Sequence, residues 1–354
     1  MGPLSGGPRG YYRIHGLVVE SEIPFNALAV DGERGGRGAN PEPTSPDGAI
    51  PDYRVIEGDA RDCPHSPPPG RILGELREQG FGYWAAETRR EPPCWTLRYT
   101  GICDVTLDCA AHTITVHRAP EADPGLIPVF LEGSVLAHAA TAEGLLILHA
   151  SAVEVEGRGL AIVGLPGAGK SSLAALLCAA GARLVADDAL RVDATATGPV
   201  CFPGTLGLRL RPTAARLGAE LEGAAVEETA DGRTAVIPVR PADAPLELAA
   251  VLVPELSRQA ATLDVRRLGA MDGFQELLRY PRLIMWQVRE PIAQLFDLTA
   301  GLAAELPVYR ATLPWGAHFR PRLAQWLLAE LELGPAPGAS ADRDAADSNA
   351  TGNG

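Results

Sequence analysis

One eight-residue segment constrains the fold of this chain more than any other. Residues 164–171 read Gly-Leu-Pro-Gly-Ala-Gly-Lys-Ser, which fits the phosphate-loop pattern G-x-x-x-x-G-K-[ST] at every position. A short apolar run at 160–163 precedes the segment, and a helical pattern over about 171–180 follows it and stops at Gly181. Because a phosphate loop lies between a strand and a helix, this context predicts an α/β domain built around the segment.

The loop residues fit the binding of nucleotide phosphates. Glycines let backbone N–H groups turn inward around phosphate oxygens, and the start of the next helix adds a partial positive charge. Lys170 is the only lysine among 31 basic residues. We expect its ammonium to contact the β- and γ-phosphates of ATP, and Ser171 to ligate Mg²⁺. A glycine-rich loop of purely structural role is the alternative. The residues expected to bind the nucleotide are Gly164, Pro166, Gly167, Ala168, Gly169, Lys170, Ser171 and Ser172.

Two adjacent carboxylates, Asp187 and Asp188, follow seventeen residues after Lys170, at the end of a strand predicted over 183–186. This strand–loop–helix–strand order is typical of a parallel βαβ unit, whose strand ends open onto one crevice. One of the two carboxylates can hold Mg²⁺, and the other can accept the proton of an incoming hydroxyl. A solvated pair that caps a helix is the alternative. Neighbouring strand residues point to opposite faces, so the two should differ in role.

Further candidates are weaker on the residues alone. His149 ends the apolar run 145–148, where a lone histidine is more often a packing residue than a catalytic one. Charge on a transferring phosphoryl group also requires a cation beyond lysine and Mg²⁺. The candidates for that cation are Arg209, Arg211 and Arg233, although a surface arginine more often serves solubility.

The rest of the chain divides into three parts. We expect a β-rich accessory domain over 1–125, an α/β domain that carries the phosphate loop over 126–333 and a disordered tail over 334–354, which has no large apolar residue. Segments 1–10 and 31–70, rich in Gly and Pro, predict loops. Strands are predicted over 12–20, 53–57, 95–99, 105–109, 114–116, 145–155, 248–253 and 263–268, and helices over 127–142, 271–278 and 321–333.

Composition excludes some classes of function. The 354 residues allow two domains, and the net charge of −13 weighs against nucleic acid as a partner. No apolar run reaches the roughly 18 residues of a membrane span, and the first residues lack a signal-peptide layout, so we expect a cytoplasmic protein without a membrane partner. We expect the six cysteines to be reduced. Self-association into a homo-oligomer is left open.

Taken together, these residues resemble a known family. The segment from His149 to Gly164, the loop through Ser171 and the Val-Ala-Asp-Asp strand end at 185–188 resemble the catalytic domain of the HPr serine kinases. The resemblance implies a P-loop core related to phosphoenolpyruvate carboxykinase, with Asp187 as the base, Asp188 assisting Mg²⁺ and His149 beside the aspartate. Residues 11–24 resemble the start of stand-alone members in biosynthetic gene clusters, some of which phosphorylate a serine of lasso-peptide precursors.

The resemblance implies an ATP- and Mg²⁺-dependent kinase acting on a serine of a peptide or small protein. Two departures weigh against HPr itself as the acceptor and against phosphorylase activity. Ser172 replaces the acidic residue of that family, and residues 205–209 keep only part of its longer signature. Two other functions remain as alternatives: a kinase for a small-molecule hydroxyl, which a closed pocket would favour, and a regulator that binds the nucleotide without turnover.

Overall fold

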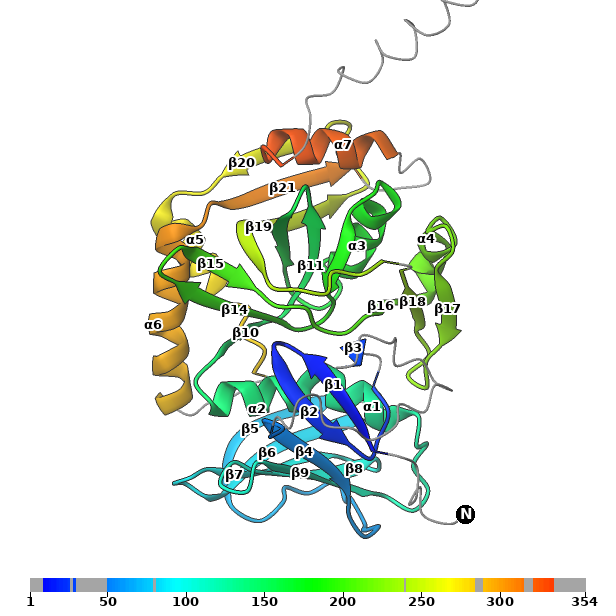
Figure 1. The fold of residues 1–354 in the computed structure, drawn as a ribbon, viewed down its shortest axis with the longest axis vertical. Coiled ribbons are helices and arrows are strands. Elements are labelled where there is room, and N and C mark those ends of the chain that lie inside the picture. The colour runs from blue at the N-terminus through cyan, green and yellow to red at the C-terminus, as the bar shows by residue number, and fades with distance from the viewer. Residues whose placement is uncertain are drawn as a thin grey trace, which may run out of the picture.

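The described residues form two large sheets and one small sheet, with helices packed on them (Figure 1). The computed structural model describes residues 9–25, 28–29, 50–78, 81–238, 240–283, 289–314 and 321–333. The N-terminal sheet has the order β3-β1-β2-β4-β9-β8-β7-β6-β5. Its strands are β1 (Gly10–Ile14), β2 (Leu17–Ser21), β3 (Leu28–Ala29), β4 (Tyr53–Glu57), β5 (Arg71–Glu78), β6 (Phe81–Arg89), β7 (Cys94–Tyr99), β8 (Cys103–Asp108) and β9 (Thr113–Arg118).

The first part of this sheet differs from the sequence prediction in one place. A single strand over 12–20 was expected, but the segment is the hairpin of β1 and β2. The prediction was wrong because His15 and Gly16, with φ of 51° and 71°, form a tight turn that an apolar pattern does not reveal. The strand predicted over 53–57 is confirmed as β4, and β7 to β9 match the other predicted strands of this region.

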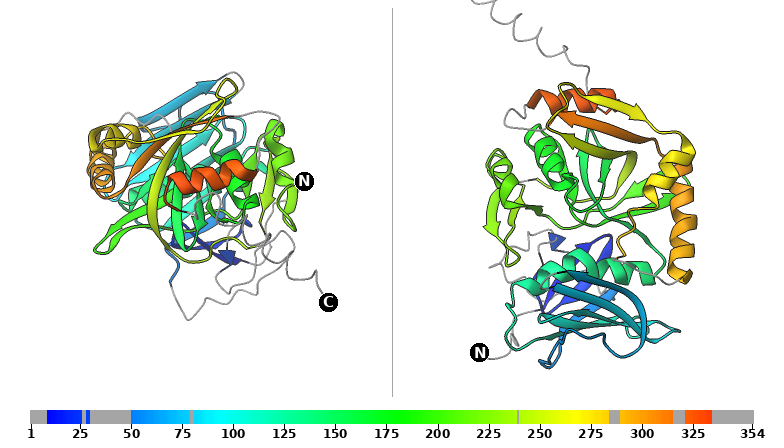
Figure 2. Two further views of the ribbon diagram at one scale, coloured as in Figure 1. Left: turned by 90° about the horizontal axis from the view of Figure 1, so that it is seen from above. Right: turned by 180° about the vertical axis from the view of Figure 1, so that it is seen from behind.

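A continuous helical segment covers this sheet and lies between it and the rest of the chain (Figures 1 and 2). It comprises α1 (Leu126–Phe130), a π-helical turn η2 (Leu131–Val135) and α2 (Leu136–Ala142). Its buried side chains, among them Leu131 and Leu136, belong to the same apolar core as the strands of the N-terminal sheet. The helical segment therefore packs with the N-terminal sheet, and we refer to the two together as the accessory region. The domain boundary predicted at 125/126 would pass between them and stays a prediction.

The second large sheet carries the phosphate loop. Its main path runs β10-β14-β15-β19-β12-β11-β13, and β21 pairs with both β19 and β20. The strands are β10 (Leu146–Leu148), β11 (Ala150–Val155), β12 (Arg158–Val163), β13 (Arg183–Ala186), β14 (Leu190–Thr195), β15 (Gly198–Cys201), β19 (Leu246–Ser257), β20 (Asp264–Arg267) and β21 (Val308–Pro314). A small sheet has the order β16-β18-β17, with strands β16 (Leu208–Leu210), β17 (Ala225–Glu228) and β18 (Thr234–Ile237).

Helices cover both faces of the second sheet. On β12, Leu160 and Ile162 face one apolar core, whereas Ala161 and Val163 face another, as the two-residue period of a strand requires. The first core includes α3 and α7, and the second includes α6. The remaining helical elements are α3 (Lys170–Ala179), η3 (Pro212–Ala214), α4 (Ala215–Gly218), α5 (Ala270–Leu277), α6 (Arg289–Glu305) and α7 (Pro321–Glu330).

The strands around the loop are connected differently from a simple βαβ unit. β12 and β13 run parallel, as predicted, but β11 lies between them and is antiparallel to both. A single strand over 145–155 was also expected and is wrong. The chain leaves β10 at His149, whose backbone N–H donates to the carbonyl of Tyr280, and β11 then pairs with other strands. This break places His149 at the cavity described below.

Several broader predictions can also be compared with the structure. The fold is mixed α/β, as expected. All six cysteines are free thiols. Among the described residues, no helix combines the length and the apolar character needed to cross a bilayer. The tail predicted over 334–354 lies outside the described residues.

Candidate active site

The phosphate loop joins β12 to α3. Gly167 and Gly169 have φ of 90° and 87°, which lies in the left-handed region that favours glycine. A Cβ atom at Gly169 would overlap the side chain of Leu256, so the close approach of β19 also requires glycine there. Gly169 is the N-cap of α3, and the helix therefore begins where its free N–H groups face the loop. The sequence thus forms a concave backbone suited to an anion.

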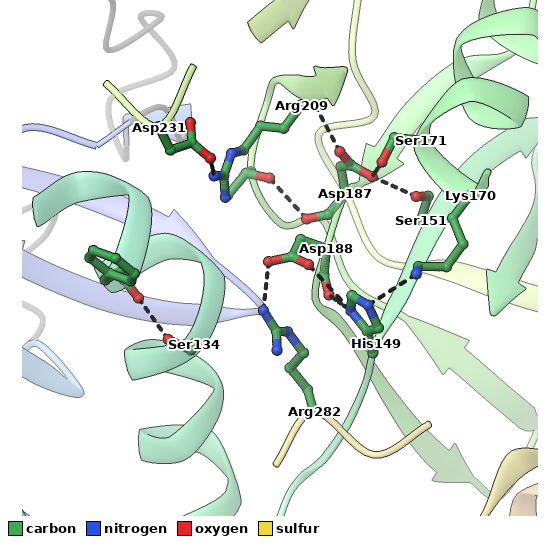
Figure 3. A network of polar contacts seen from close by, with 12 residues as sticks. Ser134, His149, Ser151, Lys170, Ser171, Asp187, Asp188, Arg209, Asp231 and Arg282 are labelled. Atoms are coloured by element: carbon green, nitrogen blue, oxygen red, sulfur yellow. Dashed lines mark hydrogen bonds and ion pairs between the residues drawn. The ribbon is translucent and has the colours of Figure 1, made fainter. Parts of the chain in front are cut away.

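Lys170 is buried within this loop. Its Nζ donates to the carbonyl of Gly164 at 2.8 Å and to that of Leu165 at 3.3 Å, and it lies 3.0 Å from Nε2 of His149 (Figure 3). Burial lowers the pKa of Lys170 to about 8. Asp187 and Asp188 partly oppose this shift by favouring the charged ammonium.

Asp187 is buried and accepts three hydrogen bonds. Its Oδ1 receives the hydroxyls of Ser151 and Ser171, the latter at 2.8 Å, and its Oδ2 receives the backbone N–H of Arg209 at 2.8 Å (Figure 3). Burial raises the pKa of Asp187, while these donors lower it in part. The carboxylate therefore connects the phosphate loop, β11 and β16.

Asp188 has a different set of partners. Its backbone has φ of 71°, which turns the chain after β13 and directs the side chain away from that of Asp187. Arg282 donates to Oδ2 at 2.8 Å, and Nδ1 of His149 lies 3.2 Å from Oδ1 and 3.0 Å from the backbone oxygen (Figure 3). Burial alone would raise the pKa of Asp188, but the positive charge of Arg282 and the contact with His149 hold it well below its usual range. This carboxylate stays ionised.

A cavity of about 1220 Å³ joins these groups. Most residues predicted for the site line it, and Gly164 and Ala168 do not. The carbonyl of Gly164 instead anchors the lysine. The predicted residues on the cavity wall are His149, Pro166, Gly167, Gly169, Lys170, Ser171, Ser172, Asp187, Asp188, Arg209, Arg211 and Arg233.

Cations are concentrated around this cavity in a chain of net charge −13. Seven arginines and the only lysine line it, together with three aspartates. Among the described residues, Arg211, Arg216 and Arg258 have no ion-pair partner, whereas the other four pair with carboxylates. The guanidinium of Arg211 also approaches Gly167, because a Cβ there would lie 3.7 Å from its Nη1. The surplus of positive charge thus extends to the phosphate loop.

The predicted cations differ in their surroundings. Arg209 and Arg233 both pair with Asp231, while Arg211 faces the loop. Sequence reasoning missed Arg282 and Ser151. Ser151 follows His149 by two residues on β11, but no local pattern marks Arg282, which is 94 residues from its partner Asp188. Among the described residues, no group of three or more His, Cys, Asp and Glu side chains is placed to hold a metal ion.

Comparisons with known proteins add little. No family model matches the chain, and no curated protein matches it. Among solved structures, the HPr(Ser) kinase/phosphatase from Coxiella burnetii is similar with a TM-score of 0.28 and 14% identity, over 53% of this chain and 96% of that one. A similarity this low does not establish a shared fold or a shared function.

Proposed function

We propose that this protein is an ATP- and Mg²⁺-dependent kinase that transfers the γ-phosphate to a serine hydroxyl of a peptide or small protein. One observation carries the proposal: a single cavity brings the phosphate-loop residues Lys170 and Ser171 together with the carboxylates Asp187 and Asp188. Phosphoryl transfer requires mainly positioning and charge, and these four side chains are the types that supply them. The sequence resemblance to HPr serine kinases points the same way.

The loop side of the cavity fits the nucleotide. The left-handed glycines allow the backbone to cradle phosphates, and Arg211, Arg216 and Arg258 bring charge that no described carboxylate neutralises. A cavity lined by cations without carboxylate partners favours an anionic ligand.

Ser171 and Asp187 fit the binding of Mg²⁺. Magnesium prefers oxygen ligands and is commonly bound by one or two protein groups together with substrate phosphates and waters. The hydroxyl of Ser171 and Oδ1 of Asp187 already meet at 2.8 Å beside the loop, where both would hold the ion or its waters. When bound, Mg²⁺ would supply positive charge that neutralises the transferring phosphoryl group. A site that uses two protein oxygens needs no larger acidic cluster, and the described residues contain none.

The geometry leads us to exchange the two aspartate roles expected from the sequence. Asp187 accepts hydrogen bonds from three donors, one of which is the loop serine Ser171, so it suits the binding of the metal ion. Asp188 lines the cavity beside His149 and Arg282 and is not bonded to the loop, so we assign to it the orientation of a serine hydroxyl and the acceptance of its proton during transfer. His149 positions both Asp188 and Lys170, and Arg282 directs the carboxylate.

Fewer observations support the class of acceptor than support the binding of ATP. A serine in a peptide follows from the sequence resemblance, and so does a precursor peptide of the lasso type. A cavity of about 1220 Å³ is large for a small metabolite alone but accommodates a nucleotide together with a segment of peptide.

Two measurements on the purified chain test this function. Isothermal titration calorimetry should show binding of MgATP, and Lys170→Ala should weaken it by roughly 10- to 100-fold, the scale of a lost charged hydrogen bond. Arg158→Ala should not, because Arg158 is a half-buried cation at the end of β12 opposite the loop. Radiolabelled γ-phosphate should then appear on serine-containing peptides. Binding without any transfer would favour a regulator, and transfer only to metabolites would favour a small-molecule kinase.

A further inference from the structure

The accessory region forms one wall of the cavity beside Asp188. Gly133, in the π-helical turn η2, packs against this carboxylate, because a Cβ atom there would lie 2.8 Å from Oδ2 of Asp188. The same position is 3.7 Å from Nη1 of Arg209 and 3.9 Å from Nη2 of Arg282. The helical segment therefore lies directly against the side chain that we place next to the acceptor hydroxyl.

The wall around Gly133 is mostly apolar. Half-buried side chains from β5, α1 and the segment after α5 face the cavity together with Tyr99 of β7. The aromatic rings of Tyr99 and Phe130 pack against each other with centroids 4.3 Å apart and a tilt of 30°. The apolar and aromatic residues of the wall are Leu76, Tyr99, Val129, Phe130 and Leu283.

The polar groups of this wall are already satisfied by one another. The hydroxyls of Tyr99 and Ser134 share a hydrogen bond of 2.5 Å, and the Ser134 hydroxyl also donates to the carbonyl of Phe130 at 3.2 Å. A surface whose hydroxyls are paired internally gains little from a polar ligand but gains from apolar contact. The wall therefore favours an apolar group of the acceptor.

Charge divides the cavity in the same way. Near the wall, Arg282 pairs with Asp188 at 2.8 Å and Arg279 with Glu276 at 3.5 Å. Arg211, which has no carboxylate partner among the described residues, lies instead beside Gly167 of the loop. An acidic acceptor would thus find the cations beside Asp188 already paired, whereas the nucleotide would find an unpaired arginine at the loop.

We propose that Leu76, Val129, Phe130 and Leu283 form an acceptor subsite that takes an apolar side chain next to the phosphorylated serine. This inference rests on the proposed kinase function and specifies its substrate class: a peptide with a serine beside a residue such as leucine, in preference to an acidic or basic flank. Gly133 provides the clearance that brings this subsite against Asp188. The accessory region thus selects the acceptor, while the loop side binds ATP.

The test uses the full chain, MgATP and short peptides that each carry one serine flanked by leucine, aspartate or arginine. The leucine-flanked peptide should have the highest kcat/KM. Leu76→Ala should lower that value about tenfold or more, the scale for removing several methylenes from an apolar contact. The loss should appear mainly in the KM of the peptide, with MgATP affinity unchanged. Ile72→Ala is the matched control, since Ile72 is an exposed apolar residue of the same strand that does not line the cavity.

The outcomes separate this inference from the function on which it rests. Transfer that prefers an acidic or basic flank, or an equal effect of Leu76→Ala and Ile72→Ala, would overturn the subsite and leave the kinase in place. Loss of MgATP affinity in Leu76→Ala would also overturn it, because the residue would then act on the nucleotide. If no peptide is phosphorylated while MgATP binds, the proposed function fails and the subsite fails with it.

Discussion

The ammonium of Lys170 lies 3.0 Å from Nε2 of His149. A charged lysine can only donate, so Nε2 accepts and the ring carries its proton on Nδ1. That proton points toward Asp188, whose backbone oxygen and Oδ1 lie 3.0 Å and 3.2 Å away. One imidazole therefore links the phosphate-binding lysine to the carboxylate that we assign as base, and it fixes the positions of both.

The lowered pKa of Lys170 predicts a pH dependence of nucleotide binding. Because the pKa of Lys170 is about 8, its side chain carries a positive charge below pH 8 and loses that charge above it. Phosphate favours the charged form, so MgATP affinity should be steady below pH 8 and then fall by up to about tenfold per pH unit. Calorimetry from pH 6.5 to 9.5 measures this, with Lys170→Ala as the control that should lack the decline. The same decline in both proteins would assign the titration to another group.

The two aspartates should respond differently to neutralisation. Asp188→Asn should retain MgATP binding and lose phosphoryl transfer by roughly 10²-fold or more, the scale of a lost general base. Asp187→Asn should instead raise the Mg²⁺ concentration needed for half-maximal nucleotide binding, because the group that meets Ser171 is lost. Calorimetry at several Mg²⁺ concentrations and a transfer assay separate the two. The reverse pattern would restore the roles expected from the sequence, and indistinguishable variants would contradict both assignments.

His149→Ala should act through its neighbours. The substitution removes a partner of Lys170 and one of Asp188 but leaves both charges in place, so the transfer rate should fall less than in Asp188→Asn. The pH profile of transfer should also shift, which a purely structural loss of activity would not produce. His112→Ala is a matched control, because its imidazole is exposed and contacts the backbone of Asp52 far from the cavity. An unchanged pH profile would contradict a positioning role.

Local sequence patterns predicted the parts of the site that are local in the chain. The loop, α3 and the strand end at Asp187 follow one another within about 25 residues, and each has its own pattern of glycine or apolar spacing. The strands β5 and β6 were missed. The sequence predicted different roles for the two aspartates but not their surroundings, because the left-handed turn at Asp188 is a backbone property that the pair itself does not encode.

The remaining features depend on long-range contacts. Arg282 reaches Asp188 across 94 residues, and the break at His149 depends on a bond to Tyr280. The sequence predicted the bounds of the helical segment over 127–142. Its apolar spacing does not show that the segment packs on the N-terminal sheet or that Gly133 contacts Asp188. Tertiary packing decides such contacts, and a single sequence does not display it.

Gly133→Ala tests how closely the accessory helix controls the base. Alanine favours a helix over glycine by about 1 kcal/mol, so the helix itself should tolerate the change. The added methyl group, however, would lie 2.8 Å from Oδ2 of Asp188, which must then move against Arg282 and His149. A shift of this kind should lower kcat by roughly 10- to 100-fold, since displacement of a reacting group by about 1 Å can cost that much. MgATP affinity should be retained.

Gly301→Ala in α6 is the matched control, because no atom outside its own helix lies within 4 Å of its Cβ position, and it should leave kcat unchanged. Thermal unfolding of both variants tests the packing. A native kcat in Gly133→Ala would show that the carboxylate adjusts freely and that the helix does not position it.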